Sequence, residues 1–221
     1  MDWDYGRARF HDRRDAGDLL ARRLLSYRDL PGVLVLGIPR GGVPVASRVA
    51  QAIQAPLDIL IVRKLGLPGM EELAMGAITS AGPPVLNRGV IEEFGVDRAT
   101  IERVAAAERS EVQRREREYR GDRPPTELEG RTIILIDDGL ATGSTMQAAV
   151  MALRLRHPAG IVVAVPVAPP PACAELRPLV DQLVCLLEPR EFLAVGAWYE
   201  DFTPTSDDEV RAVLRDAPQA A

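Results

Sequence analysis

The chain has few of the residues that metal centres and disulfide frameworks require. Among its 221 residues there are two cysteines, Cys173 and Cys185, and two histidines, His11 and His157. Their positions do not have the spacing of a zinc site, and two isolated thiols are typical of a reducing compartment. We therefore expect a cytoplasmic protein with neither a disulfide framework nor a metal ion bound directly by the chain.

The chain also lacks net positive charge, long hydrophobic runs and a Walker-type phosphate loop. Its net charge of −5 disfavours nonspecific binding to nucleic acid, which requires a basic surface. None of its apolar runs is long enough to cross a bilayer, and residues 1–10 are acidic and mixed, unlike a signal peptide. We therefore expect neither a nucleic-acid partner nor a membrane partner.

The stretch from Ile133 to Met146, IILIDDGLATGSTM, orders its residue types in a way that suits a sugar phosphate. An apolar strand, residues 133–136, leads directly into two carboxylates, Asp137 and Asp138, which can accept hydrogen bonds from sugar hydroxyls. A loop of small residues and the start of a helix follow, and both supply amide donors for a phosphate. The loop residues that we expect at the phosphate are Thr142, Gly143, Ser144 and Thr145. An ordinary strand-to-helix turn would explain a hydroxyl cap, but not two carboxylates at the end of a buried strand.

Two other predicted strands also lead into possible anion-binding loops. Residues 33–37 are followed by Arg40, Gly41 and Gly42, ahead of a helix predicted to extend to Gln54. Glycine lets the backbone approach an anion, and a guanidinium can bind phosphate through two N–H groups. Residues 57–62 are followed by Arg63 and Lys64, and Lys64 is the single lysine among 27 basic residues. For both loops the alternative is a turn with solvated surface charges.

Strands and helices alternate along the chain, which predicts an α/β fold with a twisted, mostly parallel sheet covered by helices on both faces. The predicted sheet strands are residues 33–37, 57–62, 133–136, 161–167 and 182–187, with a separate hairpin of residues 74–80 and 84–87. The predicted helices are residues 12–27, 43–54, 97–120, 146–154, 172–180 and 206–215. Ligands bind at the carboxyl ends of the strands in such folds, and all three loops begin there.

These motifs resemble those of the type I phosphoribosyltransferases, whose signature is an apolar strand, two acidic residues and a loop like Asp137 to Thr145. The resemblance implies that phosphoribosyl pyrophosphate, with magnesium bound mainly through the substrate, transfers its phosphoribosyl group to a small heterocyclic acceptor and releases pyrophosphate. Asp137 and Asp138 would be the catalytic carboxylates, and loop 142–145 would hold the 5′-phosphate. The residues implied at the pyrophosphate are Arg40, Gly41, Gly42, Arg63 and Lys64.

The same resemblance implies one domain over residues 1–221, with a core at about 31–187. A mobile lid at about 64–87 would keep water away from the reactive sugar. Residues 1–11 and 188–205 would form a small hood, in which Trp198 or Tyr199 can stack on a planar base. An aromatic cluster that closes one edge of the core is the alternative for this pair.

One position in the substrate-binding loop departs from part of the family. Enzymes for 6-oxopurines have an acidic residue where this chain has Ala141, so guanine and hypoxanthine are disfavoured as acceptors. Three functions stay open: a transferase, a non-catalytic regulator that binds phosphoribosyl pyrophosphate or a nucleotide, and a hydrolase that uses water as the acceptor. For the oligomeric state, the assembly that we consider is a homodimer.

Overall fold

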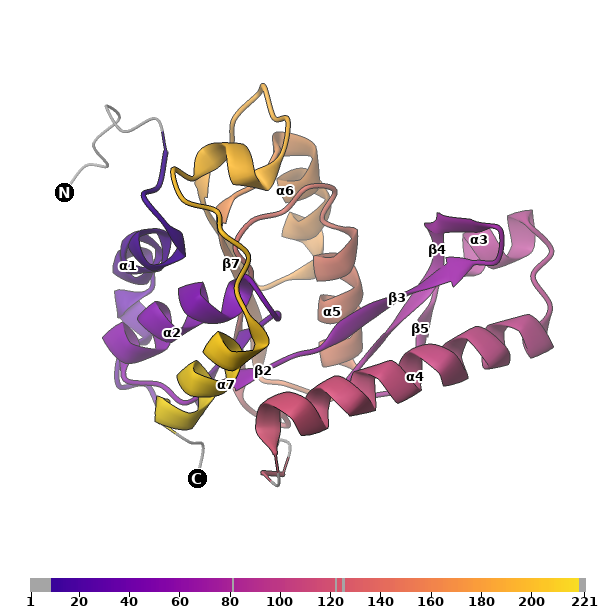
Figure 1. The fold of residues 1–221 in the computed structure, drawn as a ribbon, viewed down its shortest axis with the longest axis horizontal. Coiled ribbons are helices and arrows are strands. Elements are labelled where there is room, and N and C mark those ends of the chain that lie inside the picture. The colour runs from indigo at the N-terminus through magenta and orange to yellow at the C-terminus, as the bar shows by residue number, and fades with distance from the viewer. Residues whose placement is uncertain (1–8, 81, 122, 125, 219–221) are drawn as a thin grey trace.

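Five parallel strands form the central sheet of the computed structural model, which describes residues 9–80, 82–121, 123–124 and 126–218 (Figure 1). The strand order is β2-β1-β6-β7-β8. The strands are β1 (Val33–Gly37), β2 (Leu57–Ile59), β6 (Thr132–Ile136), β7 (Gly160–Val167) and β8 (Gln182–Leu187). Each is rich in Val, Ile and Leu, as expected for strands that are buried on both faces. The predicted parallel sheet is therefore confirmed.

Helices cover both faces of this sheet, also as predicted. On one face lie α1 (Arg13–Arg23), α2 (Gly42–Ile53) and α7 (Asp207–Asp216), while α5 (Ser144–Arg154) and α6 (Pro170–Leu176) lie on the other. Successive side chains of a strand point to opposite faces. Accordingly, Ile134 packs with the first group of helices and Ile133 with the second. Short 3-10 helices occur at η1 (Leu25–Tyr27), η2 (Arg177–Leu179) and η3 (Val195–Trp198).

A second, antiparallel sheet of order β3-β4-β5 extends from the side of the first (Figure 1). Its strands are β3 (Val62–Leu67), β4 (Met70–Thr79) and β5 (Val85–Leu86), and the short helix α3 (Arg88–Glu93), which was not predicted, follows them. Two sequence-based boundaries were wrong here. The predicted strand 57–62 is divided between the two sheets, and Arg63 and Lys64 lie within β3 and not in a loop. The predicted lid segment therefore consists largely of paired strands, and its mobility stays a prediction.

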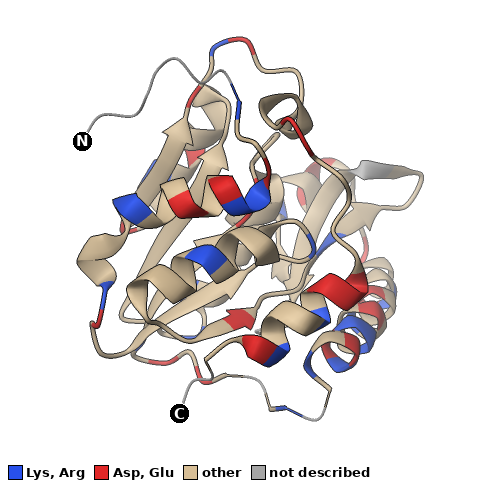
Figure 2. Ribbon diagram, turned by 60° about the vertical axis from the view of Figure 1, so that its left-hand side comes forward, with Lys and Arg blue, Asp and Glu red and all other residues tan. Residues whose placement is uncertain are grey.

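The long helix α4 (Arg98–Arg120) lies along the second sheet, and its predicted N-cap is confirmed. Asp97 accepts a hydrogen bond from the backbone N–H of Thr100 at 2.7 Å. Acidic and basic residues interleave along the helix (Figure 2), and Arg114 pairs with both Glu111 and Glu118. This pattern is that of a solvated helix face with internal ion pairs.

In the predicted hood, a residue near the start of the described chain pairs with the segment around residues 198–200. The backbone N–H of Phe10 donates to the carbonyl oxygen of Trp198, and the N–H of Glu200 donates to the carbonyl oxygen of Phe10, both at 2.8 Å. Residues 1–8 of the predicted hood lie outside the described residues. Within the described part of the chain, every helix is too short or too polar to span a bilayer.

Candidate active site

The loops that follow β1 and β6 meet because these strands are neighbours in the parallel sheet. A Cβ atom added to Gly41 would overlap the carboxylate of Asp138. One added to Gly42 would lie 2.7 Å from the carbonyl oxygen of Ile136 and 3.1 Å from Oδ1 of Asp137. Only glycine allows this approach, so the structure brings together four of the predicted site residues, Gly41, Gly42, Asp137 and Asp138.

The predicted phosphate loop follows the acidic pair directly and ends at the first turn of α5. Its path is fixed by a hydrogen bond from the N–H of Leu140 to the carbonyl oxygen of Val167 at 2.9 Å, and by the positive φ of Gly143 (+77°). Ala141 and Thr142 are exposed, while Ser144 and Thr145 are half-buried in the first helical turn. Since the first turn of an α-helix leaves backbone amides without partners in the helix, this loop has the donors of an anion site.

Arg13 is a site residue that sequence reasoning missed. Its Nε donates to Oδ2 of Asp138 at 2.8 Å, and its Nη1 donates to the carbonyl oxygen of Thr203 at 2.8 Å. Its guanidinium carbon also lies 3.9 Å from the centre of the Phe202 ring, a cation–π contact. Arg13 thereby connects α1, the acidic pair and the hood. No local pattern indicates this role, because Arg13 stands in an ordinary run of charged residues.

The two carboxylates differ in their surroundings. Asp138 is paired with Arg13, whereas Asp137 accepts a hydrogen bond from the backbone N–H of Asp138 at 2.9 Å. Burial, followed by the negative charge of Asp138, raises the pKa of Asp137 well above its ordinary value. The pair therefore combines a carboxylate held in an ion pair with a carboxyl group that holds a proton more readily than an exposed aspartate.

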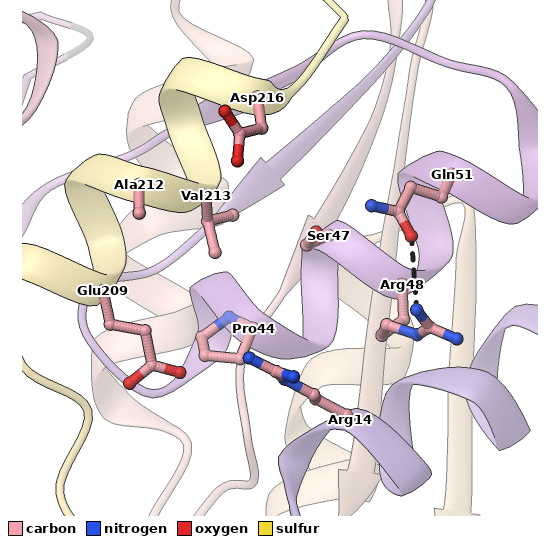
Figure 3. A pocket seen from close by; sticks show the side chains of 9 residues that line it. All are labelled: Arg14, Pro44, Ser47, Arg48, Gln51, Glu209, Ala212, Val213 and Asp216. Carbon is pink, nitrogen blue, oxygen red and sulfur yellow. Dashed lines mark hydrogen bonds between the residues drawn. The ribbon is translucent and has the colours of Figure 1, made fainter.

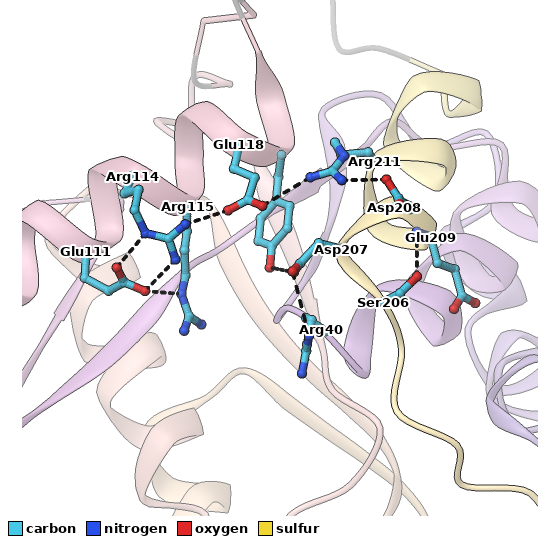
Figure 4. A network of polar contacts seen from close by, with 11 residues as sticks. Arg40, Glu111, Arg114, Arg115, Glu118, Ser206, Asp207, Asp208, Glu209 and Arg211 are labelled. Atoms are coloured by element: carbon cyan, nitrogen blue, oxygen red, sulfur yellow. Dashed lines mark hydrogen bonds and ion pairs between the residues drawn. The ribbon is translucent and has the colours of Figure 1, made fainter.

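Arg40, one of the predicted pyrophosphate cations, forms an ion pair with an acidic side chain of α7 and not with the acidic pair. Arg40 Nη1 lies 3.8 Å from Oδ2 of Asp207, at the start of α7 (Figure 4). Asp207 in turn accepts a hydrogen bond from the hydroxyl of Tyr119 at 2.5 Å. Burial and then this hydrogen bond raise the pKa of Tyr119 to about 12, so its proton stays on the hydroxyl.

Arg63 and Lys64 of β3 differ in their environments. Arg63 Nε donates to Oε2 of Glu108 on α4 at 2.7 Å, while the side chain of Lys64 is exposed. Adjacent residues of a strand point to opposite faces, which separates the two cations. Only Lys64, of the three predicted cations, has its charge open to solvent without an ion pair among the described residues.

Of the two hood aromatics, Tyr199 is not available to a ligand. It is 3% exposed, packs between Phe10 and Phe202 with ring centres 5.3 and 4.9 Å away, and donates its hydroxyl to the carbonyl oxygen of Asp138 at 2.6 Å. The prediction of base stacking by Tyr199 is therefore corrected. This ring is buried in the aromatic cluster, and its hydroxyl fixes the backbone of Asp138. Trp198 is half-buried, and its indole N–H has no hydrogen-bond partner among the described residues.

A pocket of about 290 Å³ lies between α1, α2 and α7 (Figure 3). Two guanidinium groups, of Arg14 and Arg48, and two carboxylates, of Glu209 and Asp216, line it. Arg48 is already held by Asp18, with Nε–Oδ1 at 2.6 Å. The lining contains none of the predicted site residues, so this pocket is separate from the acidic pair.

Comparisons with known proteins agree with this geometry. A family model described as the phosphoribosyl transferase domain matches residues 11–178. Two relatives from Mycobacterium tuberculosis strains, named "Putative phosphoribosyl transferase Rv0571c" and "Putative phosphoribosyl transferase MT0597", are each 46% identical over 205 residues, which is 93% of this chain. The match covers 46% of their length, so this chain spans about half of these relatives.

A solved structure extends the likeness to the whole fold. The crystal structure of TT1426 from Thermus thermophilus is 43% identical, with a TM-score of 0.84, and the match covers 93% of this chain and 97% of that one. The acidic pair, the glycine loop and the helix N-terminus all lie within the residues that the family model matches. The chain therefore belongs to the phosphoribosyl transferase domain family.

Proposed function

We propose that this domain transfers a phosphoribosyl group from phosphoribosyl pyrophosphate to a nucleobase-like acceptor, with release of pyrophosphate. The proposal depends on one observation above all, the contact between the glycine loop after β1 and the acidic pair after β6. That contact places the glycine loop, which would face the pyrophosphate, beside the two carboxylates that would face the sugar. The phosphate loop at the N-terminus of α5 continues the same edge of the sheet.

In this mechanism each part of the edge has its own task. Loop 142–145 binds the 5′-phosphate, and the loop of Arg40, Gly41 and Gly42 binds pyrophosphate. Asp137 and Asp138 accept hydrogen bonds from the ribose hydroxyls, and their charge stabilises the positive charge that develops on the sugar as the bond to pyrophosphate breaks. The acceptor nitrogen then attacks the opposite face of the sugar.

Magnesium fits this site mainly as a companion of the substrate. Carboxylate oxygens are ligands that Mg²⁺ prefers, but Oδ2 of Asp138 is engaged by Arg13. The substrate phosphates would therefore supply most of the ligands, and Asp137 would be the chain's own contribution. When bound, the ion neutralises negative charge on the leaving pyrophosphate.

The acceptor is expected to be a small planar heterocycle other than a 6-oxopurine. Ala141 is exposed in the loop beside the acidic pair and has no group that exchanges a proton with the base. Trp198 is the hood aromatic that remains a candidate for stacking, since Tyr199 is buried. A homodimer and a cytoplasmic location stay predictions of the same proposal.

A second candidate, a regulator that binds phosphoribosyl pyrophosphate without turnover, is favoured by a different observation. Arg40 and Arg63 are paired with Asp207 and Glu108, and in this arrangement neither contacts the acidic pair. A transferase would have to redirect at least one of them toward the leaving group, whereas a binding protein would not.

The test measures pyrophosphate release from phosphoribosyl pyrophosphate and Mg²⁺ with a panel of nucleobases and without any acceptor. Asp137→Asn and Asp138→Asn are expected to lower the rate by about 100-fold or more, the scale of losing a charge-stabilising group. Asp29→Asn, which changes an exposed aspartate in a turn, serves as the matched control. Calorimetric binding without release would support the regulator, and ribose 5-phosphate formation without an acceptor would support a hydrolase.

A further inference from the structure

Cys173 and Cys185 lie side by side, which contradicts the sequence-based expectation of two isolated thiols. Cys173 is on α6 and Cys185 is on β8. Together with the carboxylate of Glu188, their ligand-type atoms all lie within 4.8 Å of one another. Three residues that are 15 positions apart at most in sequence thus form a cluster that their spacing did not reveal.

The geometry of this cluster is close to that of a four-coordinate metal site. With metal–sulfur bonds of about 2.3 Å, tetrahedral coordination places two thiolate sulfurs about 3.8 Å apart. The two sulfurs therefore need to approach each other by at most about 1 Å to bind one ion. Cys173 is fully buried, Cys185 is half-buried and Glu188 is exposed, so an ion can enter from the side of Glu188.

The charges around the cluster also suit a divalent ion. Two thiolates and a carboxylate would leave one negative charge in excess after binding such an ion. Arg177 lies beside them, with Nη2 2.6 Å from Oε1 of Glu188, and its guanidinium offsets that excess.

We propose that Cys173, Cys185 and Glu188 bind a divalent transition-metal ion such as Zn²⁺, with a water molecule in the fourth position. Packing of a small apolar side chain would explain the buried Cys173, which belongs to the core beneath α6. It does not explain why a second thiol and a carboxylate with its own arginine converge on the same point. The thiolate pair selects a softer ion than Mg²⁺, so this site is distinct from the magnesium proposed at the substrate.

The position of the site gives the bound ion a structural consequence. It would tie α6 to β8, and α6 lies directly behind the phosphate loop. A Cβ atom added to Gly143 would lie 3.3 Å from Cβ of Ala172, and Gln147 of α5 donates to Glu175 of α6 at 2.8 Å. Metal binding would therefore stabilise α6, the helix that packs against the phosphate loop.

The test is a Co²⁺ titration of the reduced full chain under anaerobic conditions, followed by thiolate-to-cobalt charge-transfer absorption. We expect one Co²⁺ per chain and loss of the band in Cys173→Ser and Cys185→Ser. Glu188→Gln should weaken Co²⁺ binding by about tenfold or more, at least as much as losing an outer-shell partner of a metal ligand. Glu191→Gln, an exposed carboxylate outside the cluster, is the control and should bind like the parent.

Two results would overturn the proposal. One is the absence of a charge-transfer band at millimolar Co²⁺ while both thiols are shown to be reduced. The other is an unchanged affinity in Glu188→Gln, a surface substitution that keeps the test valid even if a cysteine variant fails to fold. Zn²⁺ should also raise the unfolding temperature of the parent but not of Cys185→Ser. Formation of a Cys173–Cys185 disulfide in place of metal binding would count against the site.

Discussion

Replacement of Arg13 by methionine tests whether this residue holds the acidic pair and the hood together. The Arg13 and Asp138 side chains are 11% and 14% exposed, so their 2.8 Å ion pair is nearly buried. Removing one partner of a buried pair costs about 3–5 kcal/mol, because the other charge is left without compensation. Since Asp138 keeps some contact with water, we expect a value near the lower limit, about 3 kcal/mol. In a chain of this size that loss lowers the unfolding temperature by roughly 6–12 °C.

Arg14→Met is the matched control for this measurement. Arg14 is the next residue of the same helix, but it is exposed, and its guanidinium makes no ion pair with the described residues. Its substitution should change stability by no more than about 0.5 kcal/mol. Urea unfolding monitored by circular dichroism and by tryptophan fluorescence gives both free energies. If the two variants differ by less than about 1 kcal/mol, the reasoning about the Arg13–Asp138 pair is refuted.

Three further predictions concern the neighbouring residues. Gly41→Ala should abolish activity and destabilise the fold by about 1–3 kcal/mol, since its Cβ would overlap Asp138; parent-like urea unfolding would contradict this. Burial and the charge of Asp138 raise the pKa of Asp137 above 3.8, so the folded state binds the extra proton and the parent loses stability as the pH rises through that raised pKa. Asp137→Asn should therefore gain stability over the parent at pH 7 but not below about pH 4, and a pH-independent difference would exclude this cause. Asp207→Asn should release Arg40 and tighten binding of phosphoribosyl pyrophosphate, measured by calorimetry; unchanged or weaker binding would show that the 3.8 Å pair does not restrain Arg40.

The parallel sheet was predictable because its strands are short, apolar and separated by helices. The acidic pair and the glycine loop were predictable for the same reason, since strands of one parallel sheet end at one edge. Segment 57–62 was misassigned because a continuous apolar run does not reveal where the backbone leaves one sheet for another. In the structure the change occurs after Ile59, where β2 ends, and β3 begins at Val62.

Contacts between distant segments were not predictable from local patterns. Arg13 is 125 positions from Asp138, and no local feature distinguishes it from Arg14. For Tyr199 the sequence allowed either base stacking or an aromatic cluster at the edge of the core, and the packing against Phe10 and Phe202 that decides for the cluster is not visible in local patterns. The approach of Cys173 to Cys185 depends likewise on the pairing of α6 with β8, which the spacing of the two residues does not specify.

The helix α4 carries the anchors of two of the predicted pyrophosphate cations. Glu108 binds Arg63 directly, and Tyr119 binds Arg40 through Asp207. The two anchors are 11 residues apart, or about 16 Å along one continuous helix. Any displacement of α4 along its axis, whether by a partner or by closure of the second sheet, therefore breaks the Arg63–Glu108 pair and the Tyr119–Asp207 hydrogen bond together, so that Arg63 becomes available to an incoming anion while Asp207 loses the support of Tyr119.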